Sequence, residues 1–566
     1  MFLPPLNPQL GLRRQLKTIV FRIPTRESPQ KPAPPMHDPA STWNTLKDIL
    51  PGTDNTVATR VSENEKRVLN VFGAPHFALL PRPEPHRSPS PYEYFCTVNE
   101  SASHVEQPRL SVTKLLTDAW CELQTFYDVF AGLPSARSAR LSSGTRHHEN
   151  LEKQAHPRVD ARRVEKQIES AAQKHAPEAV EVLFGTPMAA QLASQWSEHV
   201  TMRLVEMADT CELREIHVHG FLDLARGSLV TDAAHVRAAV LVNGVVDLVR
   251  VDASNHTQRE PWLEEGLLLV DLSCAIPRAK ATMTALSKDH FVHVYDVKTR
   301  QNDTIPAQRS VLDAARRQCM FYSRFLADLA RDSNYAYQSW LENGRRRRVE
   351  PDAPLGTGNA TELLLRHFET LALDYLRLAR GTDLGFDDFD NSHTHRQKQN
   401  VDGPEHASRY TLSDFVSAAQ FREMLAALYG QDSPFLELDV TPLFSAWKRP
   451  LTLRYFAARA GQTCNILEAV VPGSVGVEYH NMHTRRLLKR MHFALDGATL
   501  TAAVQHAASF WNGTRLPTAT DDMKRCVYCL YKNRCPVKNR ATEKVGERIY
   551  RLCESQDGAC ENLHGA

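Results

Sequence analysis

Two valine-rich segments that each carry charged residues constrain the fold of this chain most strongly. The first is AAVLVNGVVDLVRVD over 238–252, and the second is FVHVYDVKTR over 291–300. Runs of β-branched residues with this apolarity are typical of strands that are buried on both faces. A charged group in such a strand is costly unless it has a partner or a chemical role. Asp247, Asp296 and Lys298 are therefore candidate functional residues.

Segments with helical periodicity surround these two runs. Apolar residues recur at helical spacing over 110–130 and 310–330, and further helices are expected to carry HHENLEKQ (147–154) and to span 159–176. Strands and helices in this arrangement favour an α/β fold, in which helices flank a mixed sheet.

Composition divides the chain of 566 residues into segments. Residues 27–109 are rich in Pro and Ser, which predicts a disordered linker, so order is expected to begin near Leu110. The folded domain is expected over 110–540, followed by a polar tail over 541–566. Surface insertions are expected near 343–360 and 381–410, and the run Arg345–Arg348 is interpreted as solvated charge, with phosphate contact as the alternative.

Charge and cysteine content limit the classes of protein that fit. No run is long and apolar enough to predict a membrane span, and 11 widely spaced cysteines do not fit a secreted disulfide framework. The net charge of +2 allows nucleic acid as a partner, since a basic groove can lie within a nearly neutral total. Residues 1–26 contain arginines and no acid, which is typical of a mitochondrial presequence, although a basic tail has the same composition.

Asp247, Asp296 and Lys298 have the chemistry that phosphodiester hydrolysis needs. Asp296 and Lys298 stand at i and i+2, so they share one face of a strand, and Asp247 meets them if the two strands are neighbours. Two carboxylates suit Mg²⁺ or Mn²⁺, which prefer oxygen ligands, and the lysine would stabilise the charge that develops on phosphate. Taken alone the pattern is weak, because such pairs are common on solvated strands.

Two helical pairs strengthen this interpretation. Gln318 and Tyr322 stand at i and i+4 on the helix that follows the lysine strand, and His148 and Glu152 stand at i and i+4 ahead of the first strand. The histidine would complete a metal shell with Glu152 beside it. The alternatives are a core tyrosine next to a surface glutamine, and an exposed helix face.

Four cysteines form a second candidate site. Cys526, Cys529 and Cys535 follow the spacing C-x2-C-x5-C, which is a specific metal-binding signature. Cys121, Cys553 and Cys560 are candidates for the fourth ligand. Zinc and a [4Fe–4S] cluster both accept four thiolates, and the spacing does not separate them.

These motifs, in this order, resemble a known family. GTRHHENLE (144–152), GVVD (244–247), DVKTR (296–300) and QCMFY (318–322) are similar to the RecB-like nucleases of the PD-(D/E)xK superfamily. TKLLTDAWCELQTFY around Cys121 and KRCVYCLYKNRC near the end resemble its iron–sulfur members, specifically the exonuclease V family and its fungal mitochondrial branch. The resemblance spans roughly residues 110–540. Asp296 stands where many relatives have Glu. Asp is one methylene shorter than Glu and still binds metal.

The resemblance implies both cofactors and an activity. It implies a [4Fe–4S] cluster on Cys121, Cys526, Cys529 and Cys535 that staples the two ends of a nuclease core. It further implies an exonuclease that degrades single-stranded DNA from a free end to short oligonucleotides, in mitochondrial genome maintenance. We expect the protein to be a monomer. Its expected partners are single-stranded DNA and a single-strand-binding protein, and a nuclear pool is expected as a second location. The rival hypothesis is a DNA-binding or scaffold protein with a structural metal and an inactive nuclease fold.

Overall fold

A computed structural model describes most of the folded region. The described residues are 89–102, 109–131, 139–156, 161–252, 269–287, 290–306, 308–391, 410–470 and 472–541, together with residues 86, 544, 545 and 547. The expected presequence over 1–26, most of the linker and nearly all of the tail lie outside them, as do Cys553 and Cys560.

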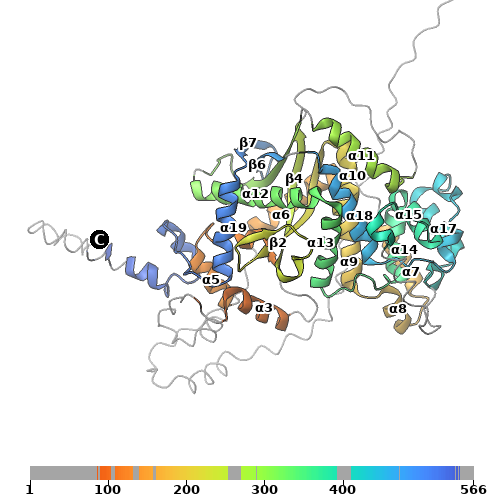
Figure 1. Ribbon diagram of the computed structural model, residues 1–566, viewed down its shortest axis with the longest axis horizontal. Coiled ribbons are helices and arrows are strands. Elements are labelled where there is room, and N and C mark those ends of the chain that lie inside the picture. The colour runs from red at the N-terminus through yellow and green to blue at the C-terminus, as the bar shows by residue number, and fades with distance from the viewer. Residues whose placement is uncertain are drawn as a thin grey trace, which may run out of the picture.

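A mixed sheet of seven strands forms the centre of the molecule (Figure 1). Its strands run in the order β3-β2-β4-β5-β6-β7, and β1 pairs with β4. The β5–β6 and β1–β4 pairs are parallel and the other pairs are antiparallel. The strand bounds are β1 Leu110–Ser111, β2 Glu212–Asp223, β3 Ser228–Val230, β4 Val240–Asp252, β5 Phe291–Arg300, β6 Pro472–Asn481 and β7 Leu487–Ala494. The two valine-rich segments are therefore neighbouring strands, which meets the condition for Asp247 to reach Asp296 and Lys298.

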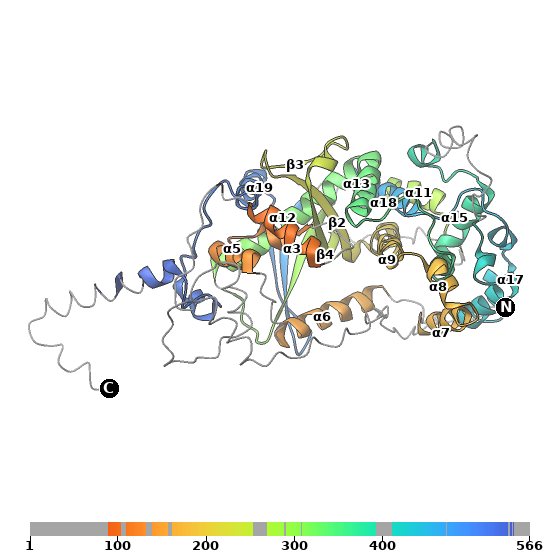
Figure 2. The ribbon, with the colours of Figure 1, turned by 90° about the horizontal axis from the view of Figure 1, so that it is seen from below.

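Helices cover both faces of the sheet. Figure 2 shows α6 on one side of the strands, and α12 and α19 on the other. The amphipathic α12 packs its apolar stripe on β2, β5 and β6. The helices around the sheet are α3 Pro91–Ala102, α4 Val112–Leu115, α5 Glu122–Ala131, α6 Ala139–Ala155, α10 Arg203–Thr210, α12 Arg309–Arg331, α13 Ser333–Arg346 and α19 Gly497–Trp511.

A second group of helices lies beside one edge of the sheet (Figure 1). Within it, α9 and α18 contact η1 and α11 contacts α10, and both η1 and α10 contact β2, while α13 packs along α18. These helices are α7 Ala161–Ala172, α8 Pro177–Phe184, α9 Pro187–Trp196, η1 Ser197–Met202, α11 Leu272–Leu286, α14 Thr357–Arg366, α15 Phe368–Arg380, α17 Ala418–Tyr429 and α18 Leu453–Cys464. Short 3-10 turns complete the elements at Val236–Ala238, Leu412–Asp414, Pro434–Glu437, Thr441–Phe444, Asn465–Leu467 and Met523–Tyr528. Among the described helices, none combines the length and apolarity that a membrane crossing needs.

The structure differs from the sequence-based expectations at three places. Helix α3 lies inside the expected linker, because the rings of Tyr94 and Phe95 pack on Phe130 and Trp511. The expected helix over 110–130 is divided into β1, α4 and α5, since residues 110–111 add to the sheet beside β4.

The expected insertions are also partly ordered. Helix α13 continues to Arg346, whose guanidinium donates to the carbonyl oxygens of Arg237 and Ala239, so the run of arginines is not simply solvated. In the second insertion, the described residues 381–391 are held by Asp390. Its carboxylate accepts hydrogen bonds from three backbone amides and pairs with Arg449.

Candidate active site and cysteine site

The candidate active site lies where β4 and β5 separate. Their ladder begins at Leu248 and Tyr295, so Asp247 and Asp296 are the first residues beyond its end. The Val297 amide that loses its strand partner there donates instead to Asp247 Oδ2 at 2.7 Å. The end of the ladder therefore brings the two acidic side chains together.

Asp296 is held by the two groups that the sequence placed near it. Its carboxylate is 1% exposed and accepts from Lys298 Nζ at 2.9 Å and from Gln318 Nε2 at 3.1 Å. Gln318 also donates to the hydroxyl of Tyr322 at 3.0 Å, so the pair on α12 supports Asp296. Burial opposes the charge on Lys298, but the nearby Asp296 and Asp247 raise its pKa above the usual value.

A group of three possible metal ligands adjoins these residues. Ligand atoms of His148, Glu215 and Asp247 all lie within 4.8 Å of one another. His148 Nδ1 lies 3.2 Å from Glu215 Oε1 and 3.6 Å from Asp247 Oδ1, and its Nε2 lies 3.0 Å from the Val297 carbonyl oxygen. Two carboxylates, an imidazole and a carbonyl suit a divalent cation such as Mg²⁺ or Mn²⁺.

Electrostatics at this group favour a bound cation. Burial and the neighbouring Asp296 raise the pKa of Asp247 to about 7. Burial lowers the pKa of His148, but the hydrogen bond to Glu215 and the charge of Asp247 outweigh it and raise that pKa to about 9. Three carboxylates gathered in a partly buried site repel one another, and a divalent cation would relieve that repulsion.

Glu215 is the functional candidate that sequence reasoning missed, and it occupies the place expected for Glu152. Glu152 turns away and pairs with Arg203 Nη2 at 2.6 Å. Glu215 has a φ of 53°, in the left-handed region that a non-glycine residue adopts at a cost of about 1–3 kcal/mol. Its segment, ELREIHVHG, gave no motif, and because it also contains Glu212, an arginine and two histidines, nothing in the sequence singled out Glu215.

Two glycines of the nuclease-like motifs, Gly144 and Gly244, have a packing role. A Cβ at Gly244 would clash with the ring of Tyr322, and one at Gly144 would lie 3.3 Å from Thr299 Oγ1. Gly244 therefore lets α12 approach β4, and Gly144 lets α6 approach β5. Both approaches bring supporting residues of the site into place.

The four expected cysteine ligands line one pocket. Cys121 precedes α5, and Cys526, Cys529 and Cys535 lie in the turns after α19, yet all four residues line the same cavity. Burial, together with the neighbouring Cys121 and Cys535, raises the pKa of Cys529 to about 11. Thiolates at this spacing are unfavourable unless a metal group stabilises them, so the donor set fits a metal centre.

Polar contacts join the same two chain segments independently of the cysteines. Glu122 is 1% exposed, and its carboxylate oxygens accept hydrogen bonds from both Nη atoms of Arg515, at 2.6 and 2.7 Å. It also accepts from the Thr518 amide at 2.8 Å and from Thr117 Oγ1 at 2.6 Å. The Tyr531 hydroxyl donates to Asp128 at 2.9 Å. The C-terminal segment is thus fixed to α5 by hydrogen bonds as well as by the cysteine pocket.

Comparison with known proteins identifies the family. A family model described as "Exonuclease V - a 5' deoxyribonuclease" matches residues 103–537. "Exonuclease V, mitochondrial" of Clavispora lusitaniae is 41% identical over 498 residues, covering 87% of this chain and 97% of that protein. The protein of the same name from Candida albicans strain WO-1 is 32% identical, covering 89% and 85%, and that of Eremothecium gossypii is 30% identical, covering 78% and 79%.

These matches support a DNA-degrading hydrolase, and the names of the relatives support a mitochondrial location. The described fold agrees with the expected mixed sheet flanked by helices. The match extends over the strands and helices that carry both candidate sites. The chain belongs to the exonuclease V family.

Proposed function

We propose that this chain is a Mg²⁺-dependent exonuclease that hydrolyses single-stranded DNA from a free end and releases short oligonucleotides. The observation that carries the proposal is the meeting of His148, Glu215 and Asp247 beside the Asp296–Lys298 pair. An inactive nuclease fold would have no need for this arrangement. The family description adds the 5′ end as the expected point of attack.

Each side chain has a role that follows from its contacts. Asp247, with His148 and Glu215, would hold the cation, and Asp296 supplies a further carboxylate next to them. The chemistry that Mg²⁺ supplies when bound is a lowered pKa for the attacking water and neutralisation of charge on the phosphate. Lys298 holds Asp296 and has 43% of its side chain exposed, so its ammonium group can approach a phosphate oxygen.

We further propose that the four cysteines hold a [4Fe–4S] cluster. A single tetrahedral zinc ion, with Zn–S bonds of about 2.3 Å, would draw the sulfurs to within about 4 Å of one another. Among the described residues, the only group of three or more ligand atoms within 4.8 Å of one another is the one around Asp247, so no three of the four cysteine sulfurs all lie that close together. That spacing suits a polynuclear cluster better than a single ion. The cluster would reinforce the junction between α5 and the C-terminal segment.

The biological setting completes the proposal. The chain would act as a monomer in mitochondrial genome maintenance on single-stranded DNA, which a single-strand-binding protein would present to it. A nuclear pool is a second proposed location.

The first experiment is a nuclease assay on end-labelled single-stranded DNA with and without Mg²⁺. We expect Mg²⁺-dependent shortening that requires a free end, and its loss in Asp296→Ala and Lys298→Ala. Lys489→Ala, an exposed lysine on β7, is the matched control and should cut normally. Normal cleavage by Asp296→Ala would show that the site is wrong. No cleavage by any metal-loaded protein, with DNA binding retained, would favour the binding-protein hypothesis.

The cluster is tested on protein purified without oxygen. A [4Fe–4S] centre gives a brown protein that absorbs near about 400 nm and contains iron. Colourless protein that contains stoichiometric zinc would contradict the cluster assignment.

A further inference from the structure

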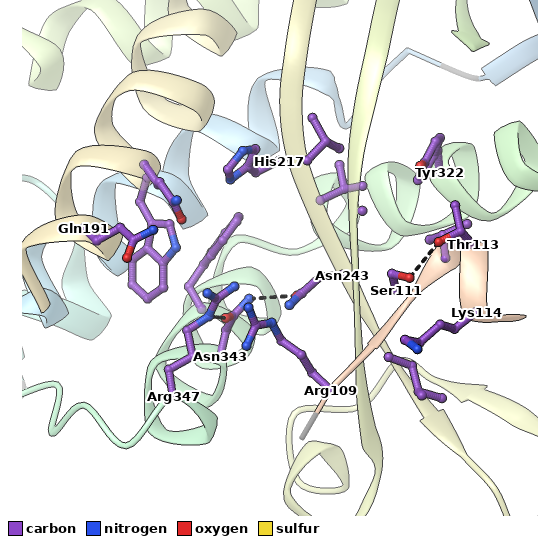
Figure 3. A pocket seen from close by; sticks show the side chains of 18 of the residues that line it. Arg109, Ser111, Thr113, Lys114, Gln191, His217, Asn243, Tyr322, Asn343 and Arg347 are labelled. Carbon is purple, nitrogen blue, oxygen red and sulfur yellow. Dashed lines mark hydrogen bonds between the residues drawn. The ribbon is translucent and has the colours of Figure 1, made fainter. Parts of the chain in front are cut away.

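A cavity of about 630 Å³ opens along β4 beside the candidate active site. Figure 3 shows Arg109, Arg347, Asn343 and His217 on one side of the strands, and Lys114, Thr113 and Tyr322 on the other. The cavity therefore reaches around β4 rather than lying over one face of the sheet. It is bounded by β1, the start of α4, α9 and the end of α13.

The charge of this cavity is one-sided. Arg109, Lys114 and Arg347 line it, and of the described residues that line it none carries a carboxylate. Arg347 Nε donates to the amide oxygen of Asn343 at 3.0 Å. When the Asn243 amide is turned to satisfy its neighbours, its oxygen accepts from Arg109 Nε at 2.9 Å and from Arg347 Nη2 at 3.3 Å. These amide partners, which are themselves uncharged, orient the two guanidinium groups.

The two arginines also act on each other. Burial, and then the charge of Arg109, lowers the pKa of Arg347 to about 9. Two cations oriented by one neutral amide would be stabilised by an anion with several acceptor oxygens. Phosphate is such an anion, and guanidinium groups bind it with two parallel hydrogen bonds.

The cavity continues directly from the metal-ligand group. His217 and Val245 pair across β2 and β4 and line the cavity, and Glu215 and Asp247 lie two residues further along the same strands. His199 connects the two places, because its ring stacks on His217 at 4.7 Å and its Nδ1 lies 3.1 Å from the Glu215 carbonyl oxygen. At about 3.3 Å per residue, Asn243 lies roughly 13 Å along β4 from Asp247.

We propose that Arg109 and Arg347 form a subsite that binds a backbone phosphodiester of the single-stranded substrate, a few nucleotides from the bond that is cleaved. This inference rests on the proposed function. Spacing supports it, since 13 Å is a few times the rise of about 3.4 Å per nucleotide in one strand of a duplex. The subsite would fix the strand in register with the metal-ligand group, so the two arginines are positioning residues.

The test measures DNA binding without cleavage, in EDTA, by fluorescence anisotropy of a labelled single strand. For single strands, the logarithm of the binding constant falls with the logarithm of salt concentration by about 0.7 per neutralised phosphate. Arg347→Gln should make this slope shallower by about 0.7, which corresponds to roughly fourfold weaker binding at about 0.15 M salt. Arg348→Gln makes the same charge change at the adjacent exposed position, and it should bind like the unchanged protein.

A second variant guards against loss of folding. Val245 is 36% exposed on the cavity wall. Val245→Glu therefore adds a negative charge that repels phosphate, and it does not leave a void in the buried core. We expect weaker binding with an unchanged thermal midpoint. Unchanged affinity and slope in both Arg347→Gln and Val245→Glu would overturn the subsite.

Two comparisons separate the remaining explanations. Equal weakening on 5′-hydroxyl and 5′-phosphorylated strands supports a backbone phosphodiester, whereas weakening confined to the phosphorylated strand would overturn it in favour of a terminal phosphate. Because the assay needs no cleavage, a shallower slope in a protein without nuclease activity would keep the subsite and refute the proposed function. Normal cleavage, with salt slopes that Arg347→Gln and Val245→Glu leave unchanged, would support the proposed function and overturn the subsite.

Discussion

The buried carboxylate of Glu122 should be one of the largest single contributors to the stability of this domain. Glu122→Ala removes the carboxylate that balances the charge of Arg515 and leaves the Thr518 amide without its acceptor; Arg515 keeps only neutral acceptors, on Ser509, His506 and Leu516. Breaking a buried ion pair by removing one partner costs about 3–5 kcal/mol. With an unfolding entropy of about 0.9 kcal/mol/K for a domain of this size, the thermal midpoint should fall by roughly 3–6 °C.

The assay is thermal unfolding followed by circular dichroism, with Glu468→Ala as the control. Glu468 pairs with Lys280 at 2.5 Å, but both side chains are at least 40% exposed, so its loss should cost less than about 1 kcal/mol. The fall for Glu122→Ala should persist after a chelator has removed any metal, because none of the partners of Glu122 is a cysteine. A midpoint within 1 °C of the control, with or without the chelator, would refute the reasoning.

Three other variants test different parts of the structure. Burial opposes the charge of Glu478, but hydrogen bonds from His480 and Arg490 outweigh it and lower its pKa from 4.5 to about 2. Its contribution of roughly 3 kcal/mol is present above pH 4.5 and is lost as the pH falls towards 2. Glu478→Gln should therefore flatten acid unfolding in that window, and an unchanged profile would contradict the assignment. Gly244→Ala forces the Tyr322 ring away, so it should lower the free energy of unfolding, measured in urea, by about 1–3 kcal/mol. It should also reduce cleavage, and full activity would disprove the packing role. Cys529→Ser should lose iron and lower the thermal midpoint, and retention of a full complement of iron would remove Cys529 from the ligand set.

Local patterns predicted the parts of the site that short-range rules control. Asp296 and Lys298 share a face because they stand two residues apart in a strand, and Gln318 meets Tyr322 because they stand four apart in a helix. The apolarity of β4 and β5 predicted two buried strands, but their pairing, which brings Asp247 to Asp296, was left as a condition that the sheet meets. Whether the metal ions expected at these residues bind there stays a prediction.

Long-range pairing decided what the sequence could not predict. Glu215 reaches the site only because β2 pairs with β4 and its own backbone turns into the left-handed region. Glu152 had the right helical spacing, but the buried Arg203 offered a stronger partner. Arg347 stands in an apparently solvated run, and its place in a cavity depends on the packing of α13 against β4. None of these contacts leaves a periodic signal in the sequence.

The parallel pairing of β5 with β6 has a consequence for how the chain reaches its native state. More than 170 residues separate Arg300 from Pro472, and helices α12, α13, α14, α15, α17 and α18 lie between them. Until that stretch has been synthesised, the strand that carries Asp296 and Lys298 has an open edge with unpaired amide and carbonyl groups. Such an edge is prone to pair with other chains, and contacts of this sequence separation form slowly. The growing polypeptide should therefore depend on chaperones during this interval, and truncation before residue 472 should yield aggregated protein rather than a smaller folded nuclease.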